Sequence, residues 1–599
     1  MTMENKLYDV FISGAGPVGL YFAYQMLSMG HSVFICDYKY GPTDQTRAIG
    51  ITARTMEHLT MGGIAHHFLK RAVILQGARC YSNGEALGNL DASIGGASLY
   101  PHGTMVSQDA QEEILIDLVE EIEQGTIRWG TTLVDYEEYE DHVEATVCKD
   151  DGNTYTVKSK YMIGADGTHS VVRKKYSGTQ EWRYDGQAIA TRFALADVTL
   201  TGRDVSKVNN NRGNIFTHPD GVCGFIPLHG PHSNLFRIAC NLGFYELSDK
   251  KETTHGISRN EQETLTLEEI RDIVAKRVAP LELIPTDPTW LTIFRINERK
   301  ANGYRRGRMF VMGDAAHCHS PVGGQGLNLG LQDANNLAWK LSLVLNGKAK
   351  DPESLLNSYS IEREPIAEGV MTATGSLTKA GISQLSIIHK WMASCAFYAV
   401  TSFGRLQTFL AKRMMGLHLQ INPESPIFLP STLKESGIFV PNTAVMQRRV
   451  VDNQVIRKSM HEILSLAPSS KHTLVWVASR LQKDVACPLS EDFWIKTQEW
   501  QHVARRVVIE SVWHAHHFSL PPYAANDMDV DNDFWLESNP ESTESLSTLI
   551  GLNDYIREND PPAALVVVRP DSYIASSSII RSVQDIDTAL QSLESYLIN

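Results

Sequence analysis

Glycines in one short segment have the spacing of a loop that binds phosphate groups: residues 14–19 read Gly-Ala-Gly-Pro-Val-Gly. In such a loop the first glycine permits a tight turn, the second lets the backbone approach a pyrophosphate, and the third allows a strand and a helix to pack closely. The N-terminus of the following helix adds N–H groups and a positive dipole. An acid at the end of the next strand can bind a ribose hydroxyl. The pattern predicts a dinucleotide site, with a structural glycine turn as the alternative; its residues are Gly14, Gly16, Pro17, Gly19 and Asp37.

A second glycine-rich segment, residues 307–330, could hold a polyol and an electron-rich ring. Asp314 follows a buried strand predicted over 309–312, so its carboxylate lies at a strand's C-terminal end and can accept hydrogen bonds from a polyol. Glycines at 323, 324 and 326 precede a helix predicted to begin at Leu331. They can bring N–H groups and the helix dipole toward electron-rich ring atoms. A structural glycine loop is again the alternative.

Five segments carry a resemblance to a known family. They are GADGTHSVVR (164–173), GRMFVMGDAAH (307–317), PVGGQGLN (321–328), DANNLAWKL (333–341) and YSIEREP (359–365). Their order and spacing resemble those of the class A FAD-dependent aromatic monooxygenases, which include phenol hydroxylase and p-hydroxybenzoate hydroxylase, and the likeness is closest to the phenol hydroxylase branch. The resemblance runs from residue 7 to about 370.

The resemblance implies FAD as the cofactor and NADPH or NADH as a co-substrate that needs no Rossmann domain of its own. It implies hydroxylation of a phenolic or aromatic substrate by O₂ through a flavin C4a-hydroperoxide, in secondary metabolism or in aromatic degradation. Baeyer–Villiger insertion or epoxidation could use the same chemistry. From another class, a non-catalytic FAD- or nucleotide-binding protein is the alternative. Besides the first loop, the implied cofactor contacts are Arg47, Gln108, Asp166, Gly313, Asp314, Gly323, Gly324, Gly326, Leu327 and Asn328.

On the substrate side, positive charge or a base near the phenol oxygen would favour the more nucleophilic phenolate. The candidates for this role are Arg192, Arg237 and His229, and the resemblance places the backbone of Pro321 against the substrate side of the flavin. One departure is informative. Phenol hydroxylases carry an aspartate where this chain has Ile49. We therefore expect an aromatic substrate larger than phenol, such as a polyketide-like phenol.

The order of predicted elements gives an α/β fold that begins with a strand–helix–strand unit. We also predict a helix from Gln111 to Glu123, a hairpin of strands over 143–147 and 155–157, and mainly helical structure from about 353 to 430. We predict a discontinuous Rossmann-like FAD-binding domain (1–185 and 290–400), an inserted mixed β-sheet for the substrate (186–289) and a helical connection (401–435). Residues 436–599 predict a C-terminal domain that resembles the thioredoxin-like domain of phenol hydroxylases. It contains no CxxC pair, which argues against thiol redox chemistry.

Composition narrows the choice of partners. The net charge of −14 argues against nucleic acid, and eight scattered cysteines predict free thiols and a cytoplasmic location. The apolar stretch over 391–404 is shorter than the roughly 20 residues that a membrane span needs. His317 and His319 lack the acidic neighbours of a metal site, so we predict no metal. A homodimer is an open expectation.

Overall fold

The computed structural model describes most of the chain. The described residues are 6–43, 49–91, 98–178, 181–208, 211–228, 234–244, 256–257, 265–320, 324–382, 404–442, 446–449, 455–465, 470–479, 487–512, 534–538, 542–543, 545–555, 558 and 560–598. Four of the predicted site residues, Arg47, His229, Pro321 and Gly323, lie outside them, as do residues 391–403 of the apolar stretch.

The first sheet is built around four parallel strands, β1 (Leu7–Ser13), β2 (Val33–Cys36), β11 (Thr154–Gly164) and β19 (Met309–Val311). Its full path is β18-β19-β11-β1-β2-β8, and the hairpin of β9 and β10 continues antiparallel from β11. The remaining strands are β8 (Ile127–Arg128), β9 (Thr131–Glu138), β10 (Val143–Lys149) and β18 (Arg305–Arg306). The middle strands are buried apolar runs, as expected for a parallel sheet covered by helices.

Three helices pack together beside this sheet: α1 (Pro17–Ser28), α4 (Gln108–Ile122) and α7 (Gln325–Leu345). Strand β1 leads directly into α1, and β2 lies parallel beside β1, so the predicted strand–helix–strand unit is present. Ser13 pairs with Gly164 at the carboxyl ends of β1 and β11, and Gly164 pairs with Val311 at the end of β19. The segments that follow these three strands therefore leave the sheet at one edge, where α/β folds bind their ligands.

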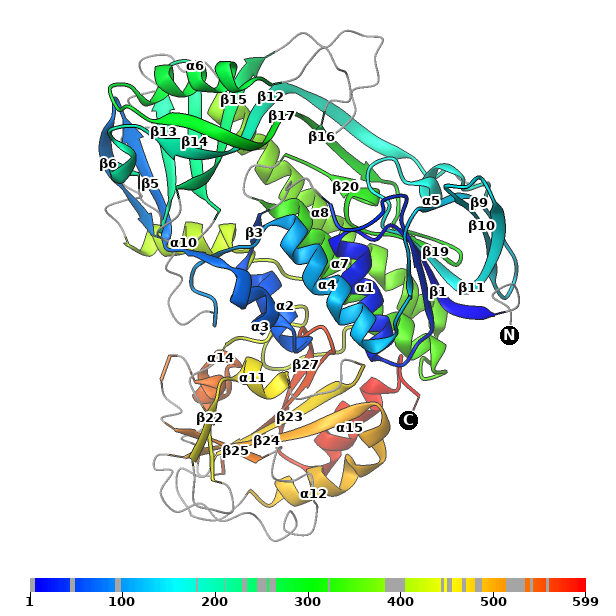
Figure 1. Ribbon diagram of the computed structural model, residues 1–599. Helices are drawn as coiled ribbons and strands as arrows, with labels where there is room; N and C mark the ends of the chain where they lie inside the picture. Colours follow the sequence, from blue (N-terminus) through cyan, green and yellow to red (C-terminus); the bar gives the residue numbers. More distant parts are fainter. Residues whose placement is uncertain are drawn as a thin grey trace.

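A second sheet of nine strands lies beside the first (Figure 1). Its path is β16-β17-β12-β15-β14-β13-β5-β6, and β20 pairs with β17. The strands are β5 (Gly77–Ser82), β6 (Glu85–Asp91), β12 (Tyr184–Thr201), β13 (Gly213–His218), β14 (Gly221–Pro227), β15 (Leu235–Phe244), β16 (Gly256–Ile257), β17 (Ile284–Ala301) and β20 (His317–Cys318). The sheet is wider than the predicted insertion at 186–289, because it also takes in residues 77–91 and the whole of β17.

Helices cover the two faces of the second sheet. Helix α6 (Leu267–Val278) packs on one face over an apolar core that contains Ala194, Ala196, Phe225 and Ile238. Helix α8 (Pro352–Ile382) contacts β14, β15 and β17 and lies on the opposite side of the sheet from α6 (Figure 1). The face toward α8 is thus the one turned toward the first sheet and its helices.

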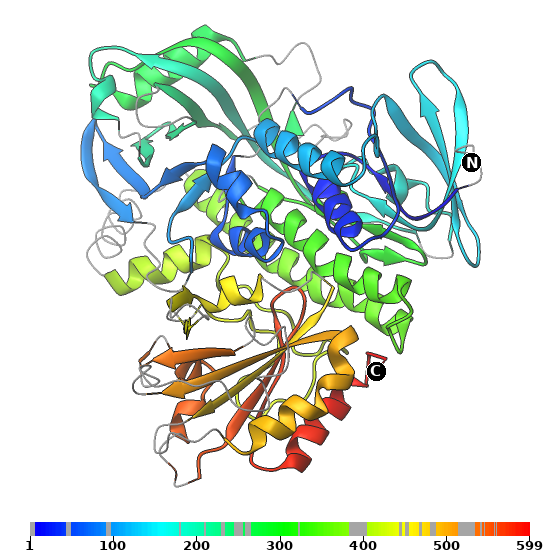
Figure 2. The same ribbon diagram turned by 60° about the horizontal axis from the view of Figure 1, so that its bottom comes forward.

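The C-terminal part forms a third sheet, ordered β22-β21-β25-β24-β23-β26-β27, which lies below the other two in both views (Figures 1 and 2). Strands β23, β24 and β25 are parallel to one another. Strand β26 pairs antiparallel with β23, and β27 pairs antiparallel with β26. The strands are β21 (Met446–Arg449), β22 (Val455–Lys458), β23 (His472–Ser479), β24 (Ala504–Val512), β25 (Phe534–Ser538), β26 (Ala563–Val568) and β27 (Ile574–Ile580). The helices are α11 (Met460–Leu464), α12 (Leu489–Lys496), α14 (Leu546–Leu549) and α15 (Val583–Leu593).

Smaller elements complete the first region. A three-stranded sheet joins β3 (Gly50–Ile51), β7 (Gly103–Met105) and β4 (Val73–Leu75). Helix α2 (Ala53–Met61) packs against α3 (Ala65–Arg71) and α7, α3 also contacts α4, and α5 (Val171–Lys174) packs against β9 and β11. A short 3₁₀ helix, η4 (Gly313–Ala315), follows β19, and α10 (Gly404–Met414) follows α8. Among the described helices, none is both long and apolar enough to cross a bilayer.

Two predicted boundaries were wrong. Helix α7 begins at Gln325, not at Leu331, because the glycines there serve helix packing: a Cβ on Gly330 would lie only 2.6 Å from Val18. Helical structure was also expected over most of 353–430. The described part of that region is helical only in α8 and α10, and residues 415–442 are irregular.

Candidate cofactor site

The first glycine loop shows three different uses of glycine. Gly14 has φ +105°, and a Cβ there would lie 2.4 Å from the carbonyl oxygen of Ala165. A Cβ on Gly19 would lie 2.0 Å from the carbonyl oxygen of Gly14. Gly16 differs, because a Cβ there would meet nothing within 4 Å. Two glycines therefore allow close packing, while the third leaves space against the backbone for a ligand.

The start of α1 suits an anion. Gly16 is the N-cap, Pro17 stands in the first turn, and that turn holds neither a side-chain cap nor an acidic residue. The first N–H groups of a helix need partners from outside it, and a phosphate group can provide them. The helix start and the space at Gly16 together fit the pyrophosphate of a dinucleotide.

Asp37 follows β2 and is buried against the loop. One carboxylate oxygen accepts the N–H of Ala15 at 2.8 Å, and the other accepts the N–H of Lys39 at 2.9 Å. Asp37 therefore holds the loop in shape. Since each carboxylate oxygen can accept more than one hydrogen bond, these contacts leave acceptor capacity for a ribose hydroxyl.

Asp166 follows β11 at the same sheet edge. Its Oδ2 accepts the N–H of Val171 at 2.8 Å and the hydroxyl of Ser13 at 3.3 Å. Its Oδ1 is buried and has no hydrogen-bond partner among the described residues. Burial raises the pKa of Asp166 above its ordinary value. A buried acceptor without a donor is costly, so this oxygen fits a hydroxyl or N–H group of a ligand.

Gly313 and Asp314 form the turn after β19. Gly313 has φ +57°, and its N–H donates to Asp333 at 3.2 Å. The carbonyl oxygen of Asp314 accepts the hydroxyl of Tyr184 at 2.9 Å, while the Asp314 side chain is exposed. The backbone of the turn is held on two sides, and its carboxylate projects free of the packing. This arrangement suits an acceptor for polyol hydroxyls.

The start of α7 resembles the start of α1. Gly324 is its N-cap with φ +63°, a Cβ there would meet nothing within 4 Å, and the first turn has no side-chain cap and no acidic residue. Gly326 lies in this turn near His319, and Leu327 packs partly against the main core. The helix start can therefore offer N–H groups to electron-rich atoms.

Asn328 has a role that the sequence did not suggest. Its side-chain amide donates to the carbonyl oxygens of Gly50 at 2.9 Å and Gly324 at 2.7 Å, and its Oδ1 accepts the N–H of Thr52 at 2.8 Å. The side chain fastens the segment before α2 to the start of α7. Any contact between Asn328 and a cofactor would therefore come from its backbone.

Gln108 begins α4, three residues earlier than the helix predicted at 111. Its side-chain amide donates to Glu112 at 2.9 Å. Glu112 is buried and also accepts the N–H of Thr43 at 2.7 Å and the ammonium of Lys39 at 3.0 Å. Sequence reasoning missed Glu112, and its position within one helical turn of Gln108 was the available signal.

The inserted sheet holds the two described substrate-side candidates. Arg237 is buried and forms a bidentate ion pair with Asp197 on the neighbouring strand, at 2.7 and 2.6 Å. Its guanidinium also lies 4.8 Å from the ring centroid of Trp290. Arg192 is half-buried on β12 and pairs in register with Arg295 of β17. The charge of Arg237 is thus already balanced within the sheet.

Sequence reasoning also missed an ion-pair system behind the Gly313 turn. The carboxylate of Asp333 accepts a hydrogen bond from the guanidinium of Arg363 at 2.7 Å and one from the imidazole of His317 at 2.8 Å. All three side chains are buried. Burial raises the pKa of Asp333, but Arg363 and His317 outweigh it and hold that pKa below its ordinary value. Within the described residues no group of His, Cys, Asp and Glu could hold a metal ion. The imidazole of His317 is instead held by its hydrogen bond to Asp333.

Comparison with known proteins identifies the family of the chain. A family model described as "FAD binding domain" matches residues 7–374. The chain is 32% identical over 371 residues to 6-methylpretetramide 4-monooxygenase of Streptomyces rimosus, a match that covers 62% of this chain and 61% of that protein.

Two solved structures share the fold over nearly the whole chain. They are anhydrotetracycline hydroxylase from Streptomyces rimosus (TM-score 0.68, 23% identity) and aklavinone-11 hydroxylase in complex with FAD and aklavinone (TM-score 0.69, 21% identity). Each match covers 99% of both chains. The protein belongs to the FAD binding domain family, and its resemblance to the class A aromatic monooxygenases is confirmed.

Proposed function

We propose that this protein is an FAD-dependent monooxygenase that hydroxylates an aromatic substrate with O₂ and NADPH or NADH. Bound FAD would supply the redox chemistry that activates O₂. The residues of the chain would bind and orient both FAD and substrate and exclude water from the reacting atoms. The named activities of the relatives support the proposal, since they are monooxygenases and hydroxylases.

The proposal rests mainly on the side chain of Val18, where three glycine-containing segments of the chain come close to one another. Val18, in the first turn of α1, lies where a Cβ on Gly313 would approach it to 3.2 Å and a Cβ on Gly330 to 2.6 Å. The pyrophosphate loop, the Asp314 turn and the first turns of α7 are therefore adjacent. We place the pyrophosphate at Gly16, the ribityl chain near Asp314 and the flavin pyrimidine ring at the start of α7.

Other predicted cofactor contacts fit the same placement. Asp37 would accept a ribose hydroxyl, the buried Oδ1 of Asp166 would accept a donor of the cofactor, and Gln108 would reach it from the start of α4. Arg47, Gly323 and the backbone of Pro321 remain predictions, because they lie outside the described residues.

For the substrate we propose the face of the second sheet that is turned toward α8. Leu195 pairs with Ala239, and Ile226 pairs with Arg237, so these side chains share one face. They lie opposite the core that α6 covers, and both Ile226 and Ala239 are partly exposed. An apolar face with few polar groups suits a large aromatic molecule. Relatives named for 6-methylpretetramide, anhydrotetracycline and aklavinone support a polyketide-like phenol.

Arg237 would then help to orient the substrate and would not act as a free cation, because Asp197 already balances its charge. Arg192 and His229 remain candidates for stabilising the phenolate. NADPH or NADH would reduce the flavin without a binding domain of its own, since the sequence carries no second nucleotide fingerprint. A homodimer likewise remains a prediction.

We propose a thioredoxin-like fold without redox chemistry for the C-terminal domain, residues 436–599. Parallel strands β23 and β24 are flanked by antiparallel β26 and β27, with α12 and α15 packed together beside the sheet. Cys487 is the single cysteine of these residues, so a dithiol cannot form. For the other domains we keep the order predicted from the sequence, but we extend the substrate sheet to include residues 77–91 and the whole of β17, which ends at Ala301.

The test combines cofactor and product analysis. The purified protein should be yellow and release FAD on denaturation. A panel of phenolic polyketides should include one that stimulates NADPH or NADH oxidation and gains one oxygen atom from ¹⁸O₂. Fragmentation of the product separates ring hydroxylation from Baeyer–Villiger insertion. A protein that takes up no FAD, or a product without label, would overturn the proposal.

A further inference from the structure

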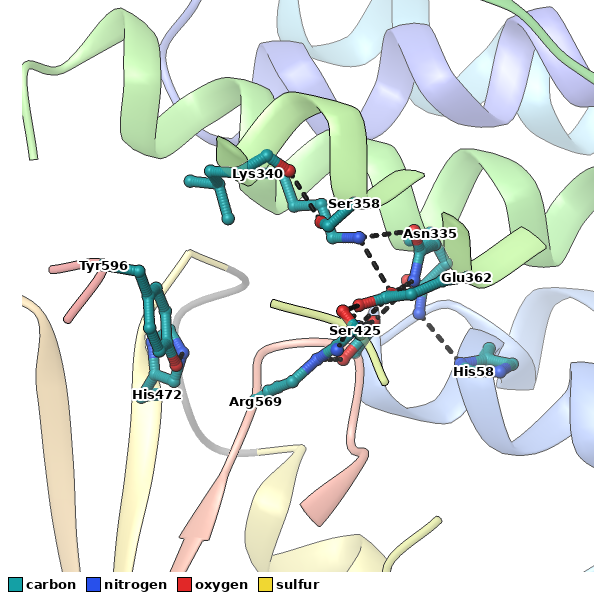
Figure 3. Close-up of polar contacts among 12 residues, drawn as sticks. His58, Asn335, Lys340, Ser358, Glu362, Ser425, His472, Arg569 and Tyr596 are labelled. Atoms are coloured by element: carbon teal, nitrogen blue, oxygen red, sulfur yellow. Dashed lines mark hydrogen bonds and ion pairs between the residues drawn. The ribbon is translucent and has the colours of Figure 1, made fainter. Parts of the chain in front are cut away.

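Two motifs of the sequence, DANNLAWKL and YSIEREP, meet the C-terminal domain in a buried ion-pair cluster (Figure 3). Glu362 of α8 is its centre. Arg569, which follows β26 in the C-terminal domain, donates to both Glu362 oxygens, at 2.8 and 2.9 Å. Both side chains are fully buried. The contact therefore joins segments 207 residues apart in the sequence.

The other hydrogen bonds of Glu362 among the described residues come from α7 and from the segment after α10, both outside the C-terminal domain. Its carboxylate accepts Asn336 at 2.7 Å and Lys340 at 2.8 Å, both on α7, and Ser425 at 2.6 Å. The carboxylate of Asp571 accepts two further hydrogen bonds. One comes from the Nε of Arg569 at 2.9 Å, and the other comes from the side-chain amide of Asn336 at 3.1 Å. Coulombic contacts with Arg569 and Lys340 outweigh the effect of burial and hold the pKa of Glu362 well below its ordinary value. The two carboxylates, Glu362 and Asp571, are balanced by two cations, Arg569 and Lys340. Loss of Arg569 would therefore leave one buried negative charge without a partner.

The next residue of α8 leads from this cluster to the proposed cofactor site. Arg363 donates to Asp333 of α7 at 2.7 Å and to the carbonyl oxygen of Leu329 at 3.3 Å. Asp333 accepts the N–H of Gly313 at 3.2 Å, and Gly313 directly precedes Asp314. Two sets of polar contacts, joined by the backbone of α8 between Glu362 and Arg363, therefore connect the C-terminal domain to the turn that would hold the ribityl chain.

We propose that Arg569 is a positioning residue for FAD: by fixing Glu362, it sets α8 against α7 so that Arg363 and Asp333 hold the Gly313–Asp314 turn in its FAD-binding form. The inference rests on the proposed placement of FAD. The C-terminal domain thereby contributes to cofactor affinity without touching the cofactor. Such coupling through a packed polar network requires that both ends bias one arrangement of the connecting helices.

The chain offers a matched control within the same domain. Arg581 forms a two-point ion pair with Glu558, at 2.8 and 3.2 Å, but both side chains are about half-exposed and the pair stays within the C-terminal domain. Arg581→Met removes the same kind of interaction without touching α8. A general weakening of the C-terminal domain would act in both variants, whereas the proposed path involves Arg569 alone.

The experiment is a titration of the full-length apoprotein with FAD, followed by flavin fluorescence and absorbance, at a temperature where circular dichroism shows each variant folded. We expect Arg569→Met to raise the FAD dissociation constant about tenfold, the usual size of such coupling, and to shift the flavin absorbance bands. Arg581→Met should bind FAD as the wild type does. Arg569→Lys, which keeps the charge but loses the two-point contact, should recover part of the loss.

A double-mutant cycle tests the route. Asp333→Asn weakens the link to Gly313 directly, so we expect its effect and that of Arg569→Met to be less than multiplicative in the double variant. If Arg569→Met does not fold, Asp571→Asn and Arg569→Lys take its place, with a smaller loss expected. The inference would be overturned if Asp571→Asn and Arg569→Lys bound FAD as tightly as the wild type. It would also be overturned if the loss of FAD affinity in the double variant equalled the product of the two single losses.

The same titration separates failure of this inference from failure of the proposed site. If Asp314→Ala and Asp333→Asn weaken FAD binding but Arg569→Met does not, the FAD placement stands and the inference fails. If the wild type binds FAD and neither Asp314→Ala nor Asp333→Asn changes the dissociation constant, the placement itself is wrong and both fail.

Discussion

The proposed cofactor site and the proposed substrate face would recognise their ligands in different ways. At the proposed cofactor site the recognising groups would be backbone atoms and carboxylates at strand ends, placed by Gly14, Gly16 and Gly313. On the second sheet the surface toward α8 is made of alternating side chains, among them Ile226 and the Arg237–Asp197 pair. Backbone recognition needs glycines at fixed spacing and leaves a motif. Side-chain recognition across strands leaves none, since each strand contributes every second residue.

The largest effect is expected at Gly14. In Gly14→Ala the new Cβ would lie 2.4 Å from the Ala165 carbonyl oxygen at φ +105°, so the variant should lose about 3 kcal/mol of stability and about a hundredfold in FAD affinity. Chemical denaturation and FAD titration measure the two losses.

Gly30→Ala is the control for Gly14→Ala, because Gly30 also has positive φ but a Cβ there would meet nothing within 4 Å. It should cost only about 1 kcal/mol of stability and leave FAD binding unchanged. Equal losses in the two variants would contradict the packing argument.

The second sheet should respond in the opposite way. Asp197→Asn leaves the buried Arg237 charge unbalanced, so we expect a loss of about 3 kcal/mol in the free energy of unfolding. FAD affinity should not change, because the pair lies in the sheet. The exposed pair of Arg183 and Asp185 is the control, and Asp185→Asn should change stability by no more than about 0.5 kcal/mol. A drop in FAD affinity in Asp197→Asn would break the separation of the two regions.

Gly16→Ala separates binding from folding within one loop. A Cβ at Gly16 meets nothing of the protein, so stability should stay within about 0.5 kcal/mol of the wild type. The methyl group would occupy the space proposed for the pyrophosphate, and we expect about a tenfold loss of FAD affinity. Unchanged affinity in the titration would place the pyrophosphate elsewhere.

The smallest effect concerns pH. Burial raises the pKa of Asp166 in the apoprotein, and a ligand donor to its Oδ1 would favour the ionised form. FAD binding should therefore release a proton, so affinity should fall as pH decreases toward the acidic range. The FAD dissociation constant measured across pH tests this, and Asp166→Asn should remove that part of the pH dependence. An identical pH profile in the variant would argue that Asp166 does not meet FAD.

Local sequence predicted much of the fold. Strand β1, helix α1 and the hairpin of β10 and β11 followed from apolar patterns and turn residues close together in the chain. The start of α7 was misjudged because Gly326 and Gly330 are poor helix formers by themselves. Packing of Gly330 against Val18, more than 300 residues earlier, decided that the helix begins at Gln325. The partner of Arg237 could not be predicted either, because Asp197 becomes its neighbour only when β12 and β15 pair.

By itself, the sequence indicated the cofactor class, because the motifs that carry the resemblance to FAD-dependent enzymes each lie within a single segment of the chain. Tertiary structure alone decided what lies behind those segments. In the folded protein the Asn328 side chain forms hydrogen bonds with the backbone of Gly50 and Thr52. His317 forms a hydrogen bond with Asp333, and Arg569 forms an ion pair with Glu362. The physical reason is that a buried charge needs a partner, and only the fold brings distant charges together.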